Sequence, residues 1–187
     1  MDLPDLMIIV ATTRTGGVGP AIADWFNDKA LTHGRFTPRT VNLAELALPF
    51  MDEPNHPRLG RYTHQHTRDW SDQVAASDAF VFVMPEYNHG FNAPLKNAID
   101  FLHQEWARKP VGFVSYGGVA GGTRAVQMIK PVVSCLQMVP VTDAVAVPFV
   151  QNCLDEHGRM KPSEIHDGAA TTLLDGLARW TAALRQP

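Results

Sequence analysis

One segment near the start of the chain contains residues with hydroxyl groups, an arginine and several glycines in close succession. Thr12 and Arg14 come directly after a short apolar run, and Gly17, Val18 and Gly19 lead into an amphipathic segment. The first turn of a helix carries unpaired N–H groups and a partial positive charge of roughly half a unit. A guanidinium adds charge-assisted hydrogen bonds to that attraction. The spacing therefore predicts a site for a phosphate monoester.

The same segment lacks two well-known phosphate fingerprints. It is neither G-x-G-x-x-G nor a Walker loop, because no Gly-Lys-Ser/Thr follows. An alternative interpretation is that the glycines only form a turn and that Thr12 or Thr13 only caps the helix. Arg14 favours the phosphate site, because capping alone gives no reason for an arginine there.

A second group of polar and aromatic residues follows another buried run. Pro85, Glu86, Tyr87, Asn88 and His89 bring together a carboxylate, an aromatic ring, an amide and an imidazole. A planar heterocycle with polar edges would find a stacking surface and hydrogen-bond partners here. The sequence predicts a ring-binding loop at this position.

A third group combines a hydroxyl and a phenol with glycines. Ser115 and Tyr116 precede Gly117 and Gly118, and a second glycine pair follows at 121–122. Because glycine has no side chain, a flat ring can approach the backbone closely at these positions. Four glycines in six positions exceed what one turn needs, so this loop is a second candidate for ring binding.

Alternating apolar elements must position these three loops. Five short apolar runs are typical of strands, and the unbroken ones suit burial on both faces of a parallel sheet. They cover residues 6–11, 36–43, 79–84, 110–116 and 139–147. Helical periodicity appears at Val18, Ile22 and Phe26, at Leu95, Ala98, Ile99 and Leu102, at Val126, Ile129, Val133 and Leu136, and at Leu173, Leu177, Trp180 and Leu184.

This alternation predicts an α/β fold, a doubly wound parallel sheet of five strands with five helices on its two faces. Ligands of such sheets lie beyond the carboxyl ends of the strands, near the point where the strand order reverses. The loops after strands one, three and four should therefore meet. We also expect Asn92 to cap a helix with Pro94 in its first turn, a loop over residues 49–61, and a kink at Pro131.

Composition narrows the class of protein. The chain has 187 residues, with 16 Lys and Arg against 19 Asp and Glu, and 45% hydrophobic residues. A domain averages roughly 150 residues, so we expect residues 1–187 to form a single domain. The net charge of -3 lacks the basic excess that binding nucleic acid requires, and no apolar run approaches the ~20 residues that cross a bilayer. We expect neither a nucleic-acid nor a membrane partner.

The two cysteines and the histidines give weaker signals. The first five residues contain two acids where a secretory signal carries basic residues, so we expect a cytoplasmic protein with free thiols. Cys135 falls in the apolar pattern of a helix and is predicted to be a buried core thiol. We expect no metal at His56, His64 and His66, because no cysteine or carboxylate stands at ligand spacing.

Taken together, the three loops resemble those of the NAD(P)H-dependent FMN reductase family. The resemblance rests on Thr12-x-Arg14, on the Pro-Glu-Tyr-Asn-His-Gly stretch at 85–90 with Leu-Lys-Asn-Ala-Ile-Asp at 95–100, and on the paired glycines up to Arg124. It implies a flavodoxin-like three-layer sandwich with strand order 2-1-3-4-5 and an FMN-binding domain. The family includes quinone, azo-dye and chromate reductases.

The resemblance assigns roles to the residues of the three loops. It implies that Thr12, Arg14 and the segment Gly17-Val18-Gly19 bind the FMN phosphate. It implies that Pro85, Glu86, Tyr87 and Asn88 border the flavin ring, that Ser115, Tyr116, Gly117 and Gly118 contact its other edge, and that Asn88 and His89 steer the acceptor. The family often has Gly-Ser and a later Ser-x-Asn where this chain has Ala11-Thr12 and Gly17-Val18-Gly19. Gly17 and Gly19 can offer only backbone N–H groups, so we expect fewer side-chain bonds to the phosphate.

The implied function is an FMN-dependent oxidoreductase. It would pass a hydride from NADPH or NADH to bound flavin, and then electrons to a quinone, azo compound, free flavin or similar small-molecule acceptor. The cofactor carries this chemistry, so no catalytic side chain is assigned. The second strand ends without the acid that binds a ribose diol, so the sequence does not decide between NADH and NADPH. The alternatives are a flavodoxin-like electron carrier and an FMN-binding redox-responsive regulator.

The family resemblance also implies a homodimer, with a tetramer as the alternative. The chain has more apolar residues here than one helix stripe needs, and they would provide a surface for the pairing: Phe101, Leu102, Trp106, Met128 and Val132. Each could instead belong to the core. Symmetric pairing would bring one chain beside the flavin of the other.

Overall fold

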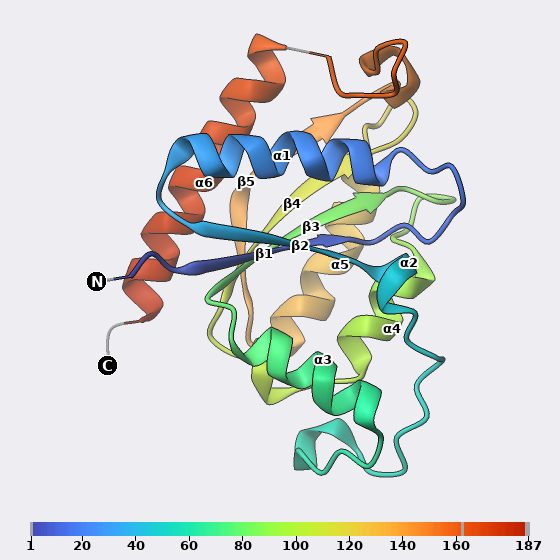
Figure 1. Ribbon diagram of the computed structural model, residues 1–187, viewed down its shortest axis with the longest axis vertical. Helices are drawn as coiled ribbons and strands as arrows, with labels where there is room; N and C mark the ends of the chain where they lie inside the picture. Colours follow the sequence, from blue (N-terminus) through green and yellow to red (C-terminus); the bar gives the residue numbers. More distant parts are fainter. Residues whose placement is uncertain (1, 162, 186–187) are drawn as a thin grey trace.

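Five parallel strands form a single sheet in the computed structural model, which describes residues 2–161 and 163–185. The strand order is β2-β1-β3-β4-β5 (Figure 1). The strands are β1 (Asp5–Val10), β2 (Thr37–Asn42), β3 (Ala79–Pro85), β4 (Pro110–Tyr116) and β5 (Val139–Val147). All five predicted strands are present, and the order expected from the family resemblance is confirmed.

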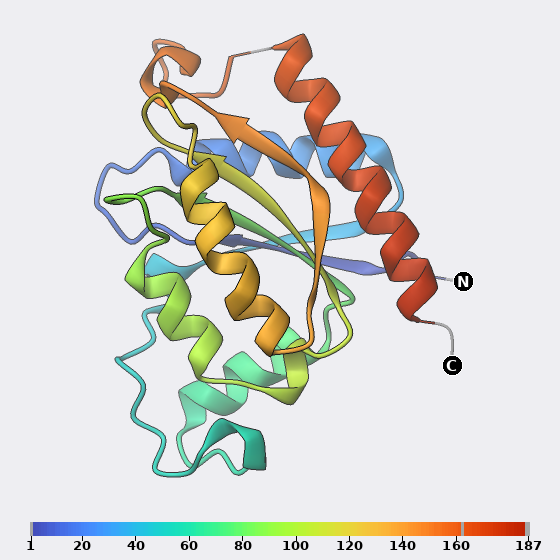
Figure 2. The same ribbon diagram turned by 180° about the vertical axis from the view of Figure 1, so that it is seen from behind.

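Helices cover both faces of the sheet, as predicted (Figures 1 and 2). One face carries α1 (Gly19–His33) and α6 (Glu164–Leu184), and the other carries α3 (Gln65–Ala75), α4 (Ala93–Asp100) and α5 (Thr123–Cys135). Short elements complete the chain: α2 (Leu43–Leu46) and the 3-10 turns η1 (Pro57–Leu59), η2 (Gln104–Trp106) and η3 (Val150–Cys153).

The central strands explain the unbroken apolar runs. Every residue of β3 and β4 is buried. Successive side chains of a strand point to opposite faces, so Leu6 and Ile8 of β1 enter the core under α1 and α6, while Met7 and Ile9 enter the core under α3, α4 and α5. A strand covered on both sides needs apolar residues at every position.

The expectation that Cys135 is a buried core thiol is wrong. Cys135 is exposed at the last position of α5. The buried stripe of α5 runs through Val126, Ile129 and Val133, and Cys135 lies two residues, or about 200°, beyond Val133. Pro131, where we expected a kink, lies inside α5, and the helix continues past it to Cys135.

Three residues of the predicted dimer surface belong to the core instead. Phe101, Leu102 and Trp106 are fully or almost fully buried, and the Trp106 ring packs edge-on against Phe80 at 5.0 Å between centroids. The reason is that α4 ends at Asp100, so these residues lie on a connection that turns beneath the sheet. Met128 stays exposed on α5.

The loop predicted around residues 49–61 is tied down at both ends. Asn97 of α4 donates to the Pro49 carbonyl (2.7 Å) and accepts from the Met51 N–H (3.0 Å). The Glu53 carboxylate accepts from the N–H groups of Thr63 (2.7 Å) and His64 (2.9 Å). Burial raises the pKa of Glu53, but these hydrogen bonds outweigh it and lower the pKa to about 2. The segment is therefore an ordered strap from α2 to α3.

Two histidines at the start of α3 contact each other and an acidic residue of the strap. His66 lies 3.0 Å from an oxygen of Asp52, and the rings of His64 and His66 stack at 5.2 Å between centroids. Within the described ranges, no cluster of three or more His, Cys, Asp or Glu side chains is arranged to hold a metal ion.

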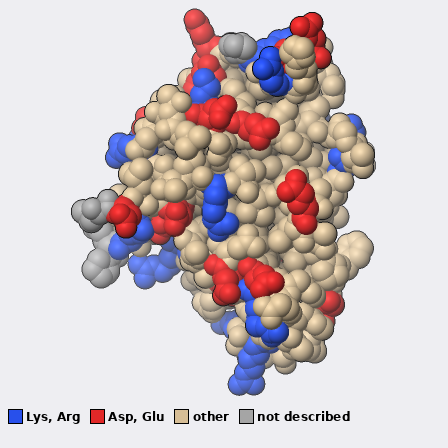
Figure 3. All heavy atoms as spheres, in the orientation of Figure 1, with Lys and Arg blue, Asp and Glu red and all other residues tan. Residues whose placement is uncertain are grey.

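Charged side chains are interspersed by sign on the face that Figure 3 shows. Acidic and basic groups are both present there, among uncharged surface. Of the helices described, none has both the length and the apolarity needed to cross a membrane.

Candidate functional site

The three loops singled out in the sequence meet at the carboxyl edge of the sheet, on the right of Figure 1. A cavity of about 140 Å³ lies between them. It sits where the strand order reverses between β1 and β3, which is the usual ligand position in such sheets. Its lining residues are Thr12, Arg14, Gly17, Val18, Pro85, Glu86, Tyr87, Tyr116 and Gly117, with Val150 and Gln151.

Thr12 anchors the loop between β1 and α1. Its side chain is buried, and its hydroxyl oxygen accepts from the Arg14 N–H (3.3 Å) and lies 3.3 Å from the Tyr87 hydroxyl. Neither Thr12 nor Thr13 caps α1, because the N-cap residue is Val18 and it makes no side-chain cap bond. Arg14 is exposed at the cavity rim, and none of the ion pairs formed by the described residues uses it. Capping alone does not account for this loop.

The two glycines of this loop have structural roles that differ from one another. The Gly17 N–H donates to the Arg14 carbonyl (2.9 Å), so it closes the turn rather than facing the cavity as a free donor. Gly19 begins α1 in a crowded position. A Cβ atom at Gly19 would lie 2.6 Å from Thr12 Cγ2 and 2.7 Å from the Tyr116 hydroxyl. Glycine is required there because it allows the helix to start directly against β1 and β4.

Tyr116 at the end of β4 points toward the α1 side of the cavity. Its ring is buried, and its hydroxyl has no hydrogen-bond partner among the described residues. Burial raises the pKa of Tyr116, so the phenol stays protonated and retains a donor. A buried donor without an acceptor is costly. The hydroxyl is therefore suited to an acceptor oxygen of a ligand near Thr12.

The loop after β3 forms a tight two-residue hairpin. The N–H groups of Tyr87 and Gly90 each donate to the other's carbonyl at 2.9 Å. Asn88 and His89 form the turn with φ values of 51° and 69°, the left-handed pair that such hairpins require. Their side chains are exposed at the tip and do not line the cavity.

A carboxylate–guanidinium pair joins the second and third loops. The Glu86 side chain is only 6% exposed, and it accepts from the Arg124 side-chain Nε (2.6 Å) and backbone N–H (3.2 Å). Burial raises the pKa of Glu86, but the hydrogen bonds and charge of Arg124 outweigh it and hold the pKa below its ordinary value. Glu86 is thus an ionised brace between the hairpin and the start of α5.

The loop after β4 folds back onto the strand end. The Ser115 hydroxyl, which is buried, donates to the Gly121 carbonyl (2.8 Å). Gly122 has a φ of 84°, and a Cβ atom there would lie 2.7 Å from the Tyr116 nitrogen. The side chain of Ser115 therefore supports the loop and does not reach the cavity, while Gly118 is exposed outside it.

Asn92 occupies the N-cap position of α4, but its side chain does something else. Its amide nitrogen donates to the Ala11 carbonyl (2.6 Å), and no side-chain cap bond forms. It ties the start of α4 to the end of β1. No local pattern predicts this contact, or the position of Val150 and Gln151, which come from η3 and line the cavity.

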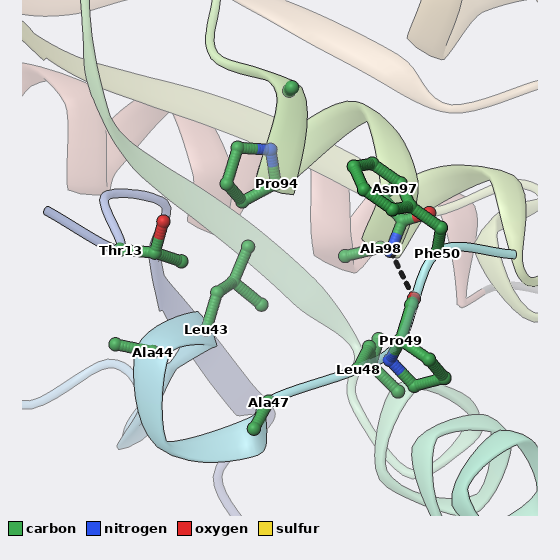
Figure 4. Close-up of a pocket in the computed structure, with 11 residues that line it drawn as sticks. Thr13, Leu43, Ala44, Ala47, Leu48, Pro49, Phe50, Pro94, Asn97 and Ala98 are labelled. Atoms are coloured by element: carbon green, nitrogen blue, oxygen red, sulfur yellow. Dashed lines mark hydrogen bonds between the residues drawn. The ribbon is translucent and has the colours of Figure 1, made fainter.

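A larger, separate cavity of about 600 Å³ lies on the other side of the loop after β1 (Figure 4). Thr13, α2, the start of the strap and the first turn of α4 surround it. Figure 4 shows Leu43 at its centre, with Pro94 and Phe50 on the α4 side.

Comparison with known proteins identifies relatives along most of this chain. The sequence profile of the family described as NADPH-dependent FMN reductase matches residues 4–152. An NAD(P)H-dependent FMN reductase of Schizosaccharomyces pombe is 38% identical over 159 residues, which are 81% of this chain and 79% of that protein. A probable NADPH:quinone oxidoreductase of Oryza sativa subsp. japonica is 42% identical over 64 residues, 33% of this chain and 32% of the rice protein.

A solved structure shares the fold. FerB from Paracoccus denitrificans, described as a flavoenzyme NAD(P)H:(acceptor) oxidoreductase, superposes with a TM-score of 0.78 over 97% of this chain and 98% of FerB. The two sequences are 18% identical. At that identity the likeness establishes the architecture.

Proposed function

Because this chain belongs to the NADPH-dependent FMN reductase family, we propose that it uses bound FMN to pass electrons from NAD(P)H to a small-molecule acceptor. The acceptor class is a quinone, free flavin or similar compound, in keeping with the names of the relatives. The family resemblance noted in the sequence is confirmed.

One observation carries the proposal most strongly, the cavity at the start of α1. It combines an exposed Arg14, the buried hydroxyl of Thr12 and the unpartnered hydroxyl of Tyr116 beside a helix N-terminus. These groups fit a phosphate monoester, which needs positive charge and several donors. The FMN phosphate would lie here.

The flavin ring would lie over the loops that Glu86 and Arg124 brace together. Pro85, Glu86, Tyr87 and Gly117 line the same cavity and border that position. The chemistry that FMN supplies when bound is the two-electron transfer from NAD(P)H to the acceptor. The protein contributes binding and orientation, because Glu86 is held ionised by Arg124 and so does not serve as a proton donor near neutral pH.

The first experiment is an FMN titration of the purified protein followed by steady-state NADPH oxidation with para-benzoquinone. We expect about one FMN per chain, seen as quenching of flavin fluorescence, and quinone-dependent turnover. FMN binding without NAD(P)H turnover would favour an electron carrier or a redox-responsive regulator. A protein that neither quenches flavin fluorescence nor turns yellow would rule out the proposal.

We propose further that the protein is a homodimer, with a tetramer of such dimers as the alternative. Support comes from two apolar side chains that remain exposed along one surface groove, because such patches are typical of interaction sites. Phe50 is 85% exposed and Met128 is 53% exposed, and both line this groove. Pairing through this surface would cover the flavin site from one side.

The oligomer proposal is tested by sedimentation of dilute, FMN-loaded protein. We expect a dimer that Met128→Lys weakens, since a charge at the centre of an apolar interface is costly. Lys130→Met on the same helix is the matched control and should leave the dimer intact. A 20.6 kDa species with full quinone reductase activity would contradict the proposal.

We also propose a cytoplasmic location. The support is that both Cys135 and Cys153 are unpaired thiols, a state that reducing compartments maintain.

A further inference from the structure

Two cavities flank the end of β1, one on each face of the sheet. Thr12 lines the cavity assigned to the FMN phosphate, whereas its neighbour Thr13 lines the larger one. Neighbouring residues of an extended chain point to opposite sides. The two cavities therefore lie on opposite sides of the loop after β1, at the crevice where strand order reverses, with the start of α1 beside the smaller one and the start of α4 beside the larger one.

The larger cavity differs from its neighbour in chemistry. None of its eleven lining residues carries a charge. Leu43, Leu48, Phe50 and Pro94 provide apolar surface, and the Thr13 hydroxyl is exposed near its rim. A ligand here gains by burying hydrocarbon, and an anionic group would be desolvated without compensation. The fit is to a neutral, apolar compound.

The walls of this cavity are held in place before any ligand arrives. The Asn97 amide, which also lines the cavity, makes two hydrogen bonds to the strap on either side of Phe50 (Figure 4 shows the one to Pro49). The Asn42 side chain accepts from the Ala44 N–H (3.0 Å) and fixes the start of α2. A large aromatic ring is thus kept exposed at the mouth, and a volume of about 600 Å³ is in the range of small-molecule sites.

We propose that this cavity binds the hydrocarbon part of a neutral acceptor, such as the alkyl chain of a substituted quinone, while the quinone ring lies toward the flavin side of the crevice. The inference rests on the proposed function and adds a substrate class, acceptors with an apolar tail. Acceptors without a tail, or with a negatively charged one, leave the cavity unused.

The test compares para-benzoquinone with decyl-benzoquinone on FMN-loaded protein. Each buried methylene strengthens binding about fourfold, so the tail should lower the Kd at least roughly tenfold even when only part of it is buried. Calorimetry without NAD(P)H measures this Kd, and steady-state rates measure the same preference in kcat/KM. Because binding is measured without turnover, a failure of the reductase activity does not affect this readout.

Ala44→Phe introduces a large side chain from α2, where Ala44 lines the cavity and is exposed. We expect it to remove most of the advantage of the tail, mainly through KM, and to leave para-benzoquinone turnover and FMN affinity within about twofold. Ala183→Phe, on an exposed position of α6, is the matched control and should change nothing.

Two results would overturn the inference. Equal affinity of the wild-type protein for the two quinones would mean that no tail enters the cavity. A loss of FMN affinity in Ala44→Phe, without loss in Ala183→Phe, would mean that the cavity holds part of the flavin instead. Widening the cavity by Leu48→Ala gives a second readout, since it should shift the preference toward bulkier tails.

Discussion

Replacing Arg14 with alanine is expected to weaken FMN binding by about ten- to a hundredfold, with little change for riboflavin. A hydrogen bond to a charged group contributes about 1.5–3 kcal/mol, and this range gives that loss. Arg14 is exposed at the cavity rim and is free of ion pairs with the described carboxylates, so its guanidinium is available to a phosphate. Riboflavin lacks the phosphate, so its affinity should be the same for the wild-type and the Arg14→Ala protein. Fluorescence titration of both flavins measures the two affinities.

Arg58→Ala serves as the matched control for the loss of one positive charge. Arg58 lies in η1 on the strap, away from the loop after β1. Its removal should affect neither flavin by more than about twofold, because surface charges act weakly at a distance in salt. Equal losses for FMN and riboflavin in Arg14→Ala would show that Arg14 acts through the structure of its loop.

Replacing Gly19 with alanine is expected to weaken FMN binding by about ten- to a hundredfold as well, for a steric reason. The added Cβ would lie 2.6 Å from Thr12 Cγ2 and 2.7 Å from the Tyr116 hydroxyl, closer than non-bonded atoms approach. Overpacking of this kind costs about 1–3 kcal/mol. Relief requires α1 to move away from β1 and β4, which separates its N-terminus from the two hydroxyls that the phosphate would contact.

Gly168→Ala is the control for this substitution. Gly168 is exposed on α6, a Cβ there meets nothing within 4 Å, and its backbone is not left-handed, so FMN binding should be unchanged and thermal stability should not fall. Thermal melting of Gly19→Ala shows how far the fold tolerates the shift. Wild-type FMN affinity in a folded Gly19→Ala protein would place the phosphate away from the start of α1.

The sequence alone determined the sheet and the placement of the loops. Buried parallel strands need apolar residues at every position, so runs such as those in β3 and β4 are visible without any tertiary information. Parallel strands also put their carboxyl ends at one edge, and the loops after β1, β3 and β4 had to meet there. The gathering of Thr12, Arg14 and Tyr87 around one cavity follows from that rule.

What the side chains do at this edge was decided by tertiary packing. The sequence around Ser115 does not show whether its hydroxyl contacts a ligand or the Gly121 carbonyl. Only the fold of the loop places the hydroxyl against Gly121. The pairing of Glu86 with Arg124 joins residues 38 positions apart, and no local pattern encodes such a contact. Likewise, Val150 and Gln151 reach the cavity only because the chain turns back after β5.

Burial of individual apolar residues was settled in the same way. Periodicity fixes which residues share a helix face, but it does not fix where the helix ends or which elements cover it. Phe101 and Trp106 are core residues because α4 stops at Asp100 and the following connection passes beneath the sheet. Cys135 is exposed because it lies on the side of α5 opposite the buried stripe that ends at Val133. Local sequence specifies the elements, whereas contacts between residues distant in the chain depend on how those elements pack, and that information exists only in the folded protein.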